Sequence, residues 1–107
     1  MRLVVMPKAA SPIFFNVPQA QRQLEEKRCV VTLRRRRKSE GKTHARVGNL
    51  FHFRDLGEVT VELLKEGITN CEADLEPYLE ESGFKSTKEW CARATAGADT
   101  LYRVCRV

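Results

Sequence analysis

The sequence predicts an α+β protein in which a small β-barrel of about five or six mixed or antiparallel strands carries two to three peripheral helices. Two observations support this fold class. Short apolar stretches with a period of two are separated by turn residues, and helical signals are confined to two places. The chain has 107 residues, of which 42% are hydrophobic. This length suits one domain with one core, so residues 1–107 are expected to form a single domain.

The first part of the chain contains a candidate strand and a candidate helix. Residues 2–6 are predicted to form a short strand, and residues 11–15 an extended or turn segment. Asn16 is a suitable N-cap and Pro18 is tolerated in a first turn, so a helix is expected over about residues 17–27. Because this helix is short and polar, it should lie on the surface.

The strand expected over residues 29–35 alternates between two faces. One face carries Cys29, Val31 and Leu33, and the other carries Val30, Thr32 and Arg34. If the more apolar face packs into the core, Thr32 and Arg34 point together into a groove or into solvent.

The middle of the chain is punctuated by turn residues. Residues 39–43 are expected to form a loop, and Gly48–Asn49 a turn before a strand over residues 50–54. A further turn over residues 55–57 then precedes a strand over residues 58–64.

Two helices and a closing strand are expected in the last third. Pro77 suits a first turn and Gly83 a C-terminal cap, which places one helix over about residues 74–83. Ser86 and Glu89 form a capping box for a second helix that ends near residue 94, and residues 100–107 form the final strand.

Targeting, membrane and metal signals are weak. The apolar run after Met1 is too short for a signal peptide, and no stretch reaches the roughly 18 apolar residues of a membrane span, so we expect a cytoplasmic protein without membrane contact. The four cysteines contain no CxxC pair, so neither a metal nor another cofactor is expected. Isolated cysteines are usually small buried hydrophobic residues in a cytosolic protein, although disulfides do occur in hyperthermophiles.

Positive charge is concentrated at the end of the strand over residues 29–35. Residues 34–46 contain seven Lys or Arg and one acid, Glu40, whereas the whole chain carries a net charge of +5. A focused positive field of this kind suits a polyanion such as RNA. The alternative is a solvated loop that keeps a small protein soluble. The candidate ligand-binding residues are Thr32, Arg34, Arg35, Arg36, Arg37, Lys38, Lys42 and Arg46.

Several short motifs follow one another in a familiar order. They are Val31-Thr32-Leu33-Arg34, Val47-Gly48-Asn49, Leu56-Gly57-Glu58-Val59-Thr60-Val61, Ser82-Gly83-Phe84 and Leu101-Tyr102-Arg103-Val104. Over residues 13–107 the chain resembles the ASCH domain (activating signal cointegrator homology), a PUA-like β-barrel family. The resemblance implies a cleft at the junction of helix and barrel, in a family proposed to bind RNA or nucleotides.

Some ASCH proteins resemble amidohydrolases that act on acetylated cytidine through a Lys, a Thr and a Glu. The family signature, Gly-x-Lys-x-x-(Thr or Glu)-x-Arg, places Thr32 and Arg34 at its Thr and Arg positions. Cys29 then stands at the Lys position, and Ser82 at the Glu position with Glu81 adjacent. Since two of the three catalytic groups are absent, no catalytic residue is assigned.

Alternatives exist for the individual side chains. Arg34 either contacts a ligand through its guanidinium fork or pairs with an acid such as Glu62 on another strand. Four aromatic residues, Phe51, Phe53, Phe84 and Trp90, either stack on bases or pack in the core, and their placement favours the core.

The predicted function is an RNA- or nucleotide-binding module that is monomeric and not catalytic, with no protein partner identifiable. One alternative is a hydrolase on a modified nucleoside or RNA, with Thr32, Arg34, Glu81 and Cys29 in its cleft. Another is a protein-interaction domain that uses the bipolar charge, because the six acids between Glu66 and Glu81 mirror the basic stretch.

Overall fold

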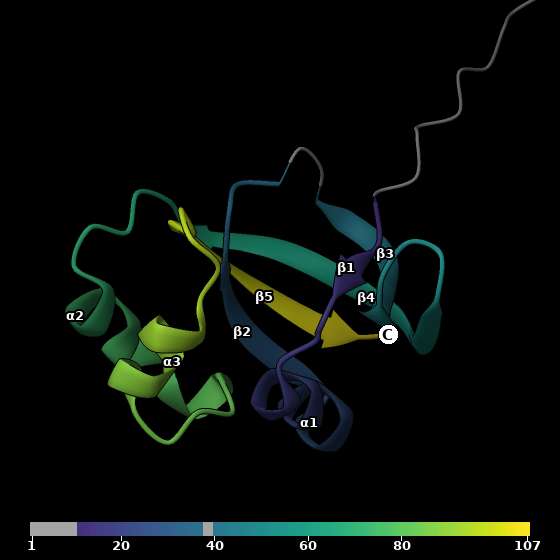
Figure 1. The fold of residues 1–107 in the computed structure, drawn as a ribbon, viewed down its shortest axis with the longest axis horizontal. Helices are drawn as coiled ribbons and strands as arrows, with labels where there is room; N and C mark the ends of the chain where they lie inside the picture. The colour runs from purple at the N-terminus through teal and green to yellow at the C-terminus, as the bar shows by residue number, and fades with distance from the viewer. Residues whose placement is uncertain (1–10, 38–39) are drawn as a thin grey trace, which may run out of the picture.

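The computed structural model describes residues 11–37 and 40–107. In that part of the chain, five strands form one mixed sheet in the order β1-β3-β4-β5-β2. Only β1 (Ile13–Phe14) and β3 (Gly41–Gly48) pair in parallel; the other neighbours are antiparallel. The sheet curls into a half-barrel, which confirms the predicted α+β class (Figure 1). The strand expected over residues 2–6 lies outside the described residues.

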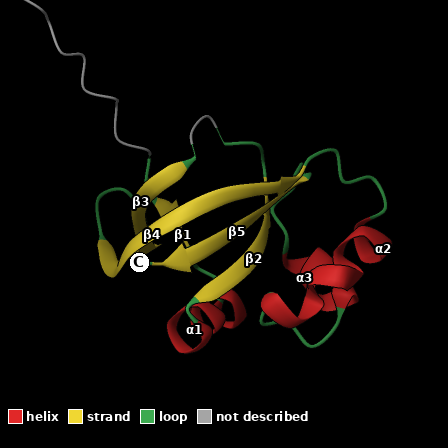
Figure 2. Ribbon diagram, turned by 180° about the vertical axis from the view of Figure 1, so that it is seen from behind, coloured by secondary structure: helices red, strands yellow, loops and turns green. Residues whose placement is uncertain are grey.

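Within residues 11–37 and 40–107, three α-helices and one 3-10 helix accompany the sheet. Helix α1 (Pro18–Lys27) packs beside β2 (Cys29–Arg34), close to its predicted bounds. The second group consists of α2 (Cys71–Leu75), the 3-10 helix η1 (Glu76–Glu81) and α3 (Thr87–Arg93). This group lies beyond β2, on the side away from the rest of the sheet, as both views show (Figures 1 and 2). None of the helices in the described part of the chain is long and apolar enough to cross a membrane.

Two apolar clusters lie on either side of β2. In the first, Leu24 of α1 packs against sheet residues that include Val30 and Tyr102. In the second, Val31 packs with Trp90 and the other buried residues of the helical group. β2 is buried on both faces for most of its length. The groove expected beside Thr32 and Arg34 is present, but it is confined to the C-terminal half of the strand.

The hairpin between β3 and β4 (Phe53–Lys65) differs from prediction. Residues 41–43 of the expected loop are the start of β3, because buried Thr43 alternates with exposed Lys42 and pairs with β4. The expected strand over residues 50–54 is mostly the turn between β3 and β4.

The expected turn over residues 55–57 is a bulge inside β4. There the register with β3 shifts, Gly57 has a φ of +107°, and its N–H donates to Asp55 Oδ1 at 2.7 Å. Turns and bulges both use glycine at positions with positive φ, so the turn signal in the sequence corresponds to a bulge in the structure.

Two helix starts also differ from prediction. The cap of α1 is Val17, because the Asn16 side chain instead pairs with the backbone of Gly48. The helix expected from residue 74 begins at Cys71 behind Asn70 and tightens into the 3-10 helix η1, where Pro77 stands in the first turn. Ser86 caps α3 as predicted, since its hydroxyl accepts the Glu89 N–H at 3.1 Å, and β5 (Thr100–Arg106) closes the sheet.

The cysteines form two disulfides, which corrects the expectation of isolated buried thiols. Cys29 and Cys105 stand directly opposite each other on β2 and β5, with Cα atoms 4.1 Å apart. Cys71 and Cys91 join α2 to α3. The spacing along the chain concealed these pairs because each bond joins elements that meet only in the folded sheet or helical group.

Candidate functional site

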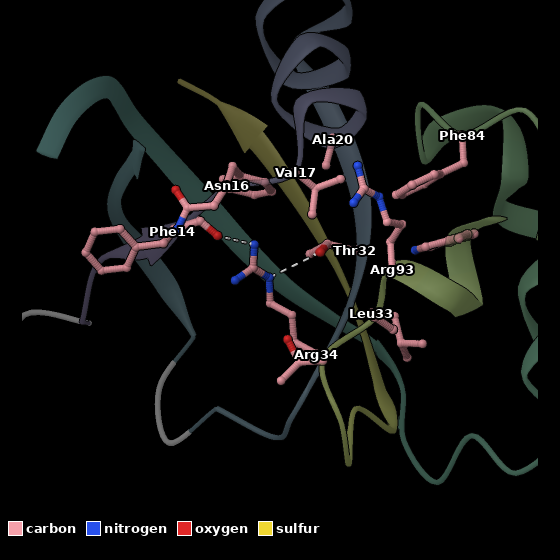
Figure 3. A pocket seen from close by; sticks show the side chains of 13 residues that line it. Phe14, Asn16, Val17, Ala20, Thr32, Leu33, Arg34, Phe84 and Arg93 are labelled. Carbon is pink, nitrogen blue, oxygen red and sulfur yellow. Dashed lines mark hydrogen bonds between the residues drawn. The ribbon is translucent and has the colours of Figure 1, made fainter. Parts of the chain in front are cut away.

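A cavity of about 280 Å³ opens where the edge strands β1 and β2 approach each other. Its wall is built from the segment after β1, from the C-terminal half of β2, and from α3 (Figure 3). Small-molecule sites typically measure roughly 300–1,000 Å³. The cavity is therefore of a size for one small ligand, and not for an extended chain.

Arg34 crosses the cavity from β2 toward β1. Its Nη2 donates to the carbonyl of Phe14 at 2.5 Å, and its Nε donates to Thr32 Oγ1 at 3.1 Å. The guanidinium also lies over the ring of Phe15, 4.7 Å from the centroid. Thr32 and Arg34 thus share one face of β2, as the strand alternation predicts. Nη1 donates to none of the described residues, which leaves it available to a ligand.

The Arg34 guanidinium has no carboxylate neighbour among the described residues. No acid lies within ion-pair distance, so the alternative in which it pairs with Glu62 is wrong for the described chain. Burial and then the like charge of Arg37 lower the pKa of Arg34 to about 10. A buried cation without a counter-ion is costly, and a bound anion would relieve that cost.

Arg93 adds a second cation to the same cavity. It lies in the last turn of α3, and its side chain extends toward Val17 and Ala20 of the opposite wall (Figure 3). Within the described residues it has no hydrogen-bond or ion-pair partner. The two guanidinium groups therefore approach the cavity from different elements, an arrangement that suits a phosphate group.

Aromatic rings form the rest of this wall. Phe84 and Trp90 are buried, as predicted, and stack on each other with ring centroids 6.1 Å apart and an interplanar angle of 12°. Both line the cavity. An aromatic face next to cations is the combination that binds a base together with its phosphate.

Two contacts hold the helical wall against α1. The amide nitrogen of Gln19 donates to Glu89 Oε1 at 2.8 Å. Gly83 has a φ of +84°, and a Cβ added there would lie 2.3 Å from the carbonyl oxygen of Gln19. Because only glycine permits this approach, Gly83 fixes how closely the helical group packs on α1.

The rest of the arginine run is occupied by contacts within the protein. Arg35 Nε donates to the carbonyl of Ala96 at 2.8 Å, and Arg36 forms an ion pair with Glu66. Arg37 Nη2 donates to the carbonyl of Ser11 at 2.6 Å, and burial lowers the pKa of Arg37. The backbone N–H of Arg37 donates to the hydroxyl of buried Tyr102 at 2.7 Å. These three cations do not line the cavity beside Arg34.

The remaining predicted cations lie along β3 or outside the described residues. Lys42 pairs with Glu58 at 3.6 Å. Arg46 stacks over the ring of Phe53, 3.9 Å from its centroid. Lys38 is not among the described residues. Of the eight predicted ligand-binding residues, the structure therefore places Thr32 and Arg34 in the cavity.

The residues of the hydrolase alternative are not brought together. Thr32 and Arg34 line the cavity, whereas Cys29 and Glu81 line a separate, more open depression. Cys29 is bonded to Cys105, and Glu81 forms a two-bond ion pair with Arg103. The hydroxyl of Ser82 is buried and donates to the carbonyl of Leu79 at 2.6 Å. Among the described residues, no group of three or more His, Cys, Asp or Glu is placed to hold a metal ion.

Sequence reasoning missed Arg93 and the segment after β1. Arg93 is a lone cation at the end of a short helix, and nothing in its local sequence indicates that the helix faces β2. The segment Phe14–Val17 lines the cavity, and the carbonyl of Phe14 accepts a hydrogen bond from Arg34. The local sequence does not reveal this contact either.

Three comparisons with known proteins leave the family open. Neither the protein-family models, nor the curated proteins, nor the solved structures contain a significant match to this chain. The resemblance to the ASCH domain therefore remains an expectation from the sequence motifs.

Proposed function

We propose that this protein is an RNA- or nucleotide-binding module, with the cavity between β1, β2 and α3 as its binding site. The observation that carries the proposal is the Arg34 guanidinium, which is buried at the cavity and has no carboxylate neighbour in the described part of the chain. Arg34 and Arg93 would hold a phosphate, and the Phe84 and Trp90 wall would take a base. We do not propose a catalytic activity.

The finer assignments belong to the same proposal. We propose a PUA-like barrel of the ASCH type, because the half-barrel and the helix beside β2 resemble the arrangement that this family implies. We also propose a monomeric, cytoplasmic protein. Its two disulfides restrict that location to a cell whose cytosol sustains structural disulfides, as in hyperthermophiles.

Electrostatic attraction outside the cavity is expected to be moderate. The basic stretch is already partly neutralised, since Arg36 and Lys42 pair with acids. Engagement of about three or four phosphates by the remaining cations gives a slope of roughly −2 to −3 in a plot of log affinity against log salt concentration.

The test is binding of a fluorescein-labelled uridine hexanucleotide, followed by anisotropy over a range of KCl concentrations. Arg34→Met should weaken binding at least about tenfold, because it removes a positioned charge-assisted contact. The matched control is Arg22→Met, which removes the same charge from an exposed position on α1. It should change affinity less than about twofold. Equal effects of the two substitutions would reduce the site to a diffuse cationic surface, and affinity independent of salt would overturn the proposal.

A further inference from the structure

The tip of the β3–β4 hairpin exposes large apolar side chains. Leu50 is 69% exposed, Phe51 87% and Phe53 44%. The expectation that Phe51 and Phe53 pack in the core is therefore wrong. Phe51 lies in the turn over residues 49–52, and Phe53 is the exposed first residue of β4. Exposing a phenylalanine is unfavourable, and an apolar patch of this kind marks a place where something binds.

The tip is held in a defined conformation. The side chain of Asn49 accepts the backbone N–H groups of Phe51 and His52, at 2.9 and 3.0 Å. Gly48 precedes it with a φ of +121°. Asn16 braces Gly48 with two hydrogen bonds: its side-chain nitrogen donates to the Gly48 carbonyl at 2.9 Å, and its side-chain oxygen accepts the Gly48 N–H at 2.7 Å. A ring presented on a fixed turn loses little conformational freedom on binding.

Neighbouring residues on β1, β3 and β4 lead from the cavity to the base of the tip. Phe14 lines the cavity with its carbonyl toward Arg34, while its ring points away from that guanidinium (Figure 3). Phe14 and Arg46 are partners in the β1–β3 pairing, and residues paired in a sheet project to the same face. Arg46 in turn stacks on Phe53. We call Phe14, Arg46, Phe53, Phe51 and Leu50 the hairpin strip.

The chemistry of the hairpin strip favours single-stranded RNA over other ligands. Arg46 lies between Phe14 and Phe53, so bases can stack on the exposed rings while Arg46 meets a phosphate between them. The strip also continues directly from the proposed nucleotide cavity. Arg46 lies about 7 Å along β3 from Gly48, where the turn of the hairpin begins. A stacked nucleic-acid strand rises about 3.4 Å per nucleotide, so a few nucleotides cover this distance. A membrane surface would engage the exposed apolar side chains of the tip, Leu50, Phe51 and Phe53, and would leave Arg46 and Phe14 unexplained.

We propose that the hairpin strip binds the nucleotides that flank the one held in the cavity, so that the substrate is a single-stranded segment of RNA and not a free nucleotide. This inference rests on the function proposed above. Its consequence is that the protein binds an oligonucleotide more tightly than a mononucleotide, and that the difference depends on Phe51 and Phe53.

The experiment compares two ligands on the same variants. Binding of 5′-UMP is followed through Trp90, the only tryptophan in the chain, whose ring lines the cavity. Binding of a labelled uridine hexanucleotide is followed by anisotropy. Phe51→Ala should weaken binding of the hexanucleotide about 5- to 150-fold, the range of losses for removing one stacking ring. It should leave binding of 5′-UMP unchanged within about twofold. Phe51→Trp should restore the hexanucleotide affinity. Phe53→Ala should change the two affinities in the same way as Phe51→Ala.

The control is Val107→Ala, since Val107 is 65% exposed and lies outside the strip. It should change neither affinity. If Phe51→Ala and Phe53→Ala leave hexanucleotide binding intact while Arg34→Met abolishes it, the inference is overturned and the cavity proposal stands. If Phe51→Ala instead abolishes binding to phosphatidylserine vesicles, or dissociates a dimer, without affecting the hexanucleotide, the tip serves a membrane or a second copy of the chain, and the inference is likewise overturned. If neither 5′-UMP nor the hexanucleotide binds, both proposals fail.

Discussion

The guanidinium of Arg34 on β2 donates to the carbonyl of Phe14 on β1 at 2.5 Å. These strands are the two edges of the sheet, and they do not pair through their backbones. A side chain therefore spans the opening where a closed barrel would continue its hydrogen-bond ladder. The same opening holds the cavity, so the residue that joins the edges is also the one that presents a buried charge to a ligand.

The stability of the Arg34→Met variant should separate a ligand-binding role from a structural one. Burial, and to a lesser degree the charge of Arg37, lowers the pKa of Arg34 from its ordinary value to about 10. The folded state therefore holds the proton less tightly than the unfolded state, and at any pH below about 10 the charge disfavours folding by about 3 kcal/mol. Arg34→Met removes this unfavourable buried charge. The gain offsets the loss of the two hydrogen bonds of Arg34, each worth roughly 1–2 kcal/mol.

We expect the free energy of unfolding of Arg34→Met to lie within about 1 kcal/mol of the parent in a urea titration, because the two effects nearly cancel. The comparison is Phe15→Ala, which empties a core position that is 1% exposed and should cost about 3–5 kcal/mol. A loss of more than about 3 kcal/mol in Arg34→Met would make Arg34 a structural tie between the edge strands and would weaken the proposed binding role.

The two disulfides should contribute unequally. The Cys29–Cys105 bond closes a loop with a sequence separation of 76, and the Cys71–Cys91 bond one of 20. The loss of chain entropy in the unfolded state then gives about 4–5 kcal/mol for the first and about 3 kcal/mol for the second. Urea titrations of the two double Cys→Ala variants measure both values, and equal losses would contradict this ranking.

Removal of Cys71–Cys91 should also weaken nucleotide binding. That bond ties α2 to α3, which carries Trp90 and Arg93 in the cavity wall. Removal of Cys29–Cys105 should leave the affinity unchanged under conditions where the variant is folded, because neither cysteine lines the cavity. The opposite order of affinities would show that the α2–α3 link does not position the wall.

Gly83→Ala should move the helical group away from α1. The added Cβ would meet the carbonyl oxygen of Gln19 at 2.3 Å, and the residue would keep a φ of +84°. The matched control is Gly67→Ala, where φ is +66° and nothing lies within 4 Å of the added Cβ. We expect a loss of about 1 kcal/mol for the control, from backbone strain alone, and at least twice as much for Gly83→Ala. Thermal unfolding of both variants measures the difference. Similar losses of stability in the two variants would mean that the helical group can move away from α1 without a loss of free energy.

Asp55 should contribute to the acid sensitivity of the fold. The N–H of Gly57 donates to its carboxylate, and this bond, together with the neighbouring His44, lowers the pKa of Asp55 from 3.8. A depressed carboxyl pKa stabilises the folded state above pH 3.8, and this contribution disappears as the pH falls through the folded-state pKa.

Asp55→Asn retains an acceptor for Gly57 but removes the titrating group. Its free energy of unfolding should therefore decrease less steeply than that of the parent between pH 5 and pH 2 in urea titrations. Parallel pH profiles of the two proteins would show that Asp55 does not contribute to acid unfolding.

Much of the fold could be predicted from local sequence. The alternation of side chains around Thr32 correctly predicted β2 and the face that Thr32 and Arg34 share. Ser86 correctly predicted the start of α3. The errors arose where a local signal serves another purpose. Asn16 reads as a helix cap but braces Gly48, and Asp55-Leu56-Gly57 reads as a turn but forms a bulge.

The site was harder to predict than the fold. The run of arginines drew attention to residues 35–37, yet their side chains are committed to Ala96, Glu66 and Ser11. Arg34 differs from them only because β1 and α3 close around it, and those contacts join residues far apart in the sequence. Arg93 and the exposed Phe51 depend likewise on how the elements pack, which no local pattern records.

A crystal structure of the protein with a bound uridine trinucleotide tests the proposed binding site most directly. We predict a phosphate within hydrogen-bonding distance of Arg34 Nη1 and of Arg93, with one base against the wall formed by Phe84 and Trp90. An empty cavity, with the trinucleotide bound to Arg35, Arg36 and Lys42, would contradict this prediction and assign binding to the basic stretch outside the cavity.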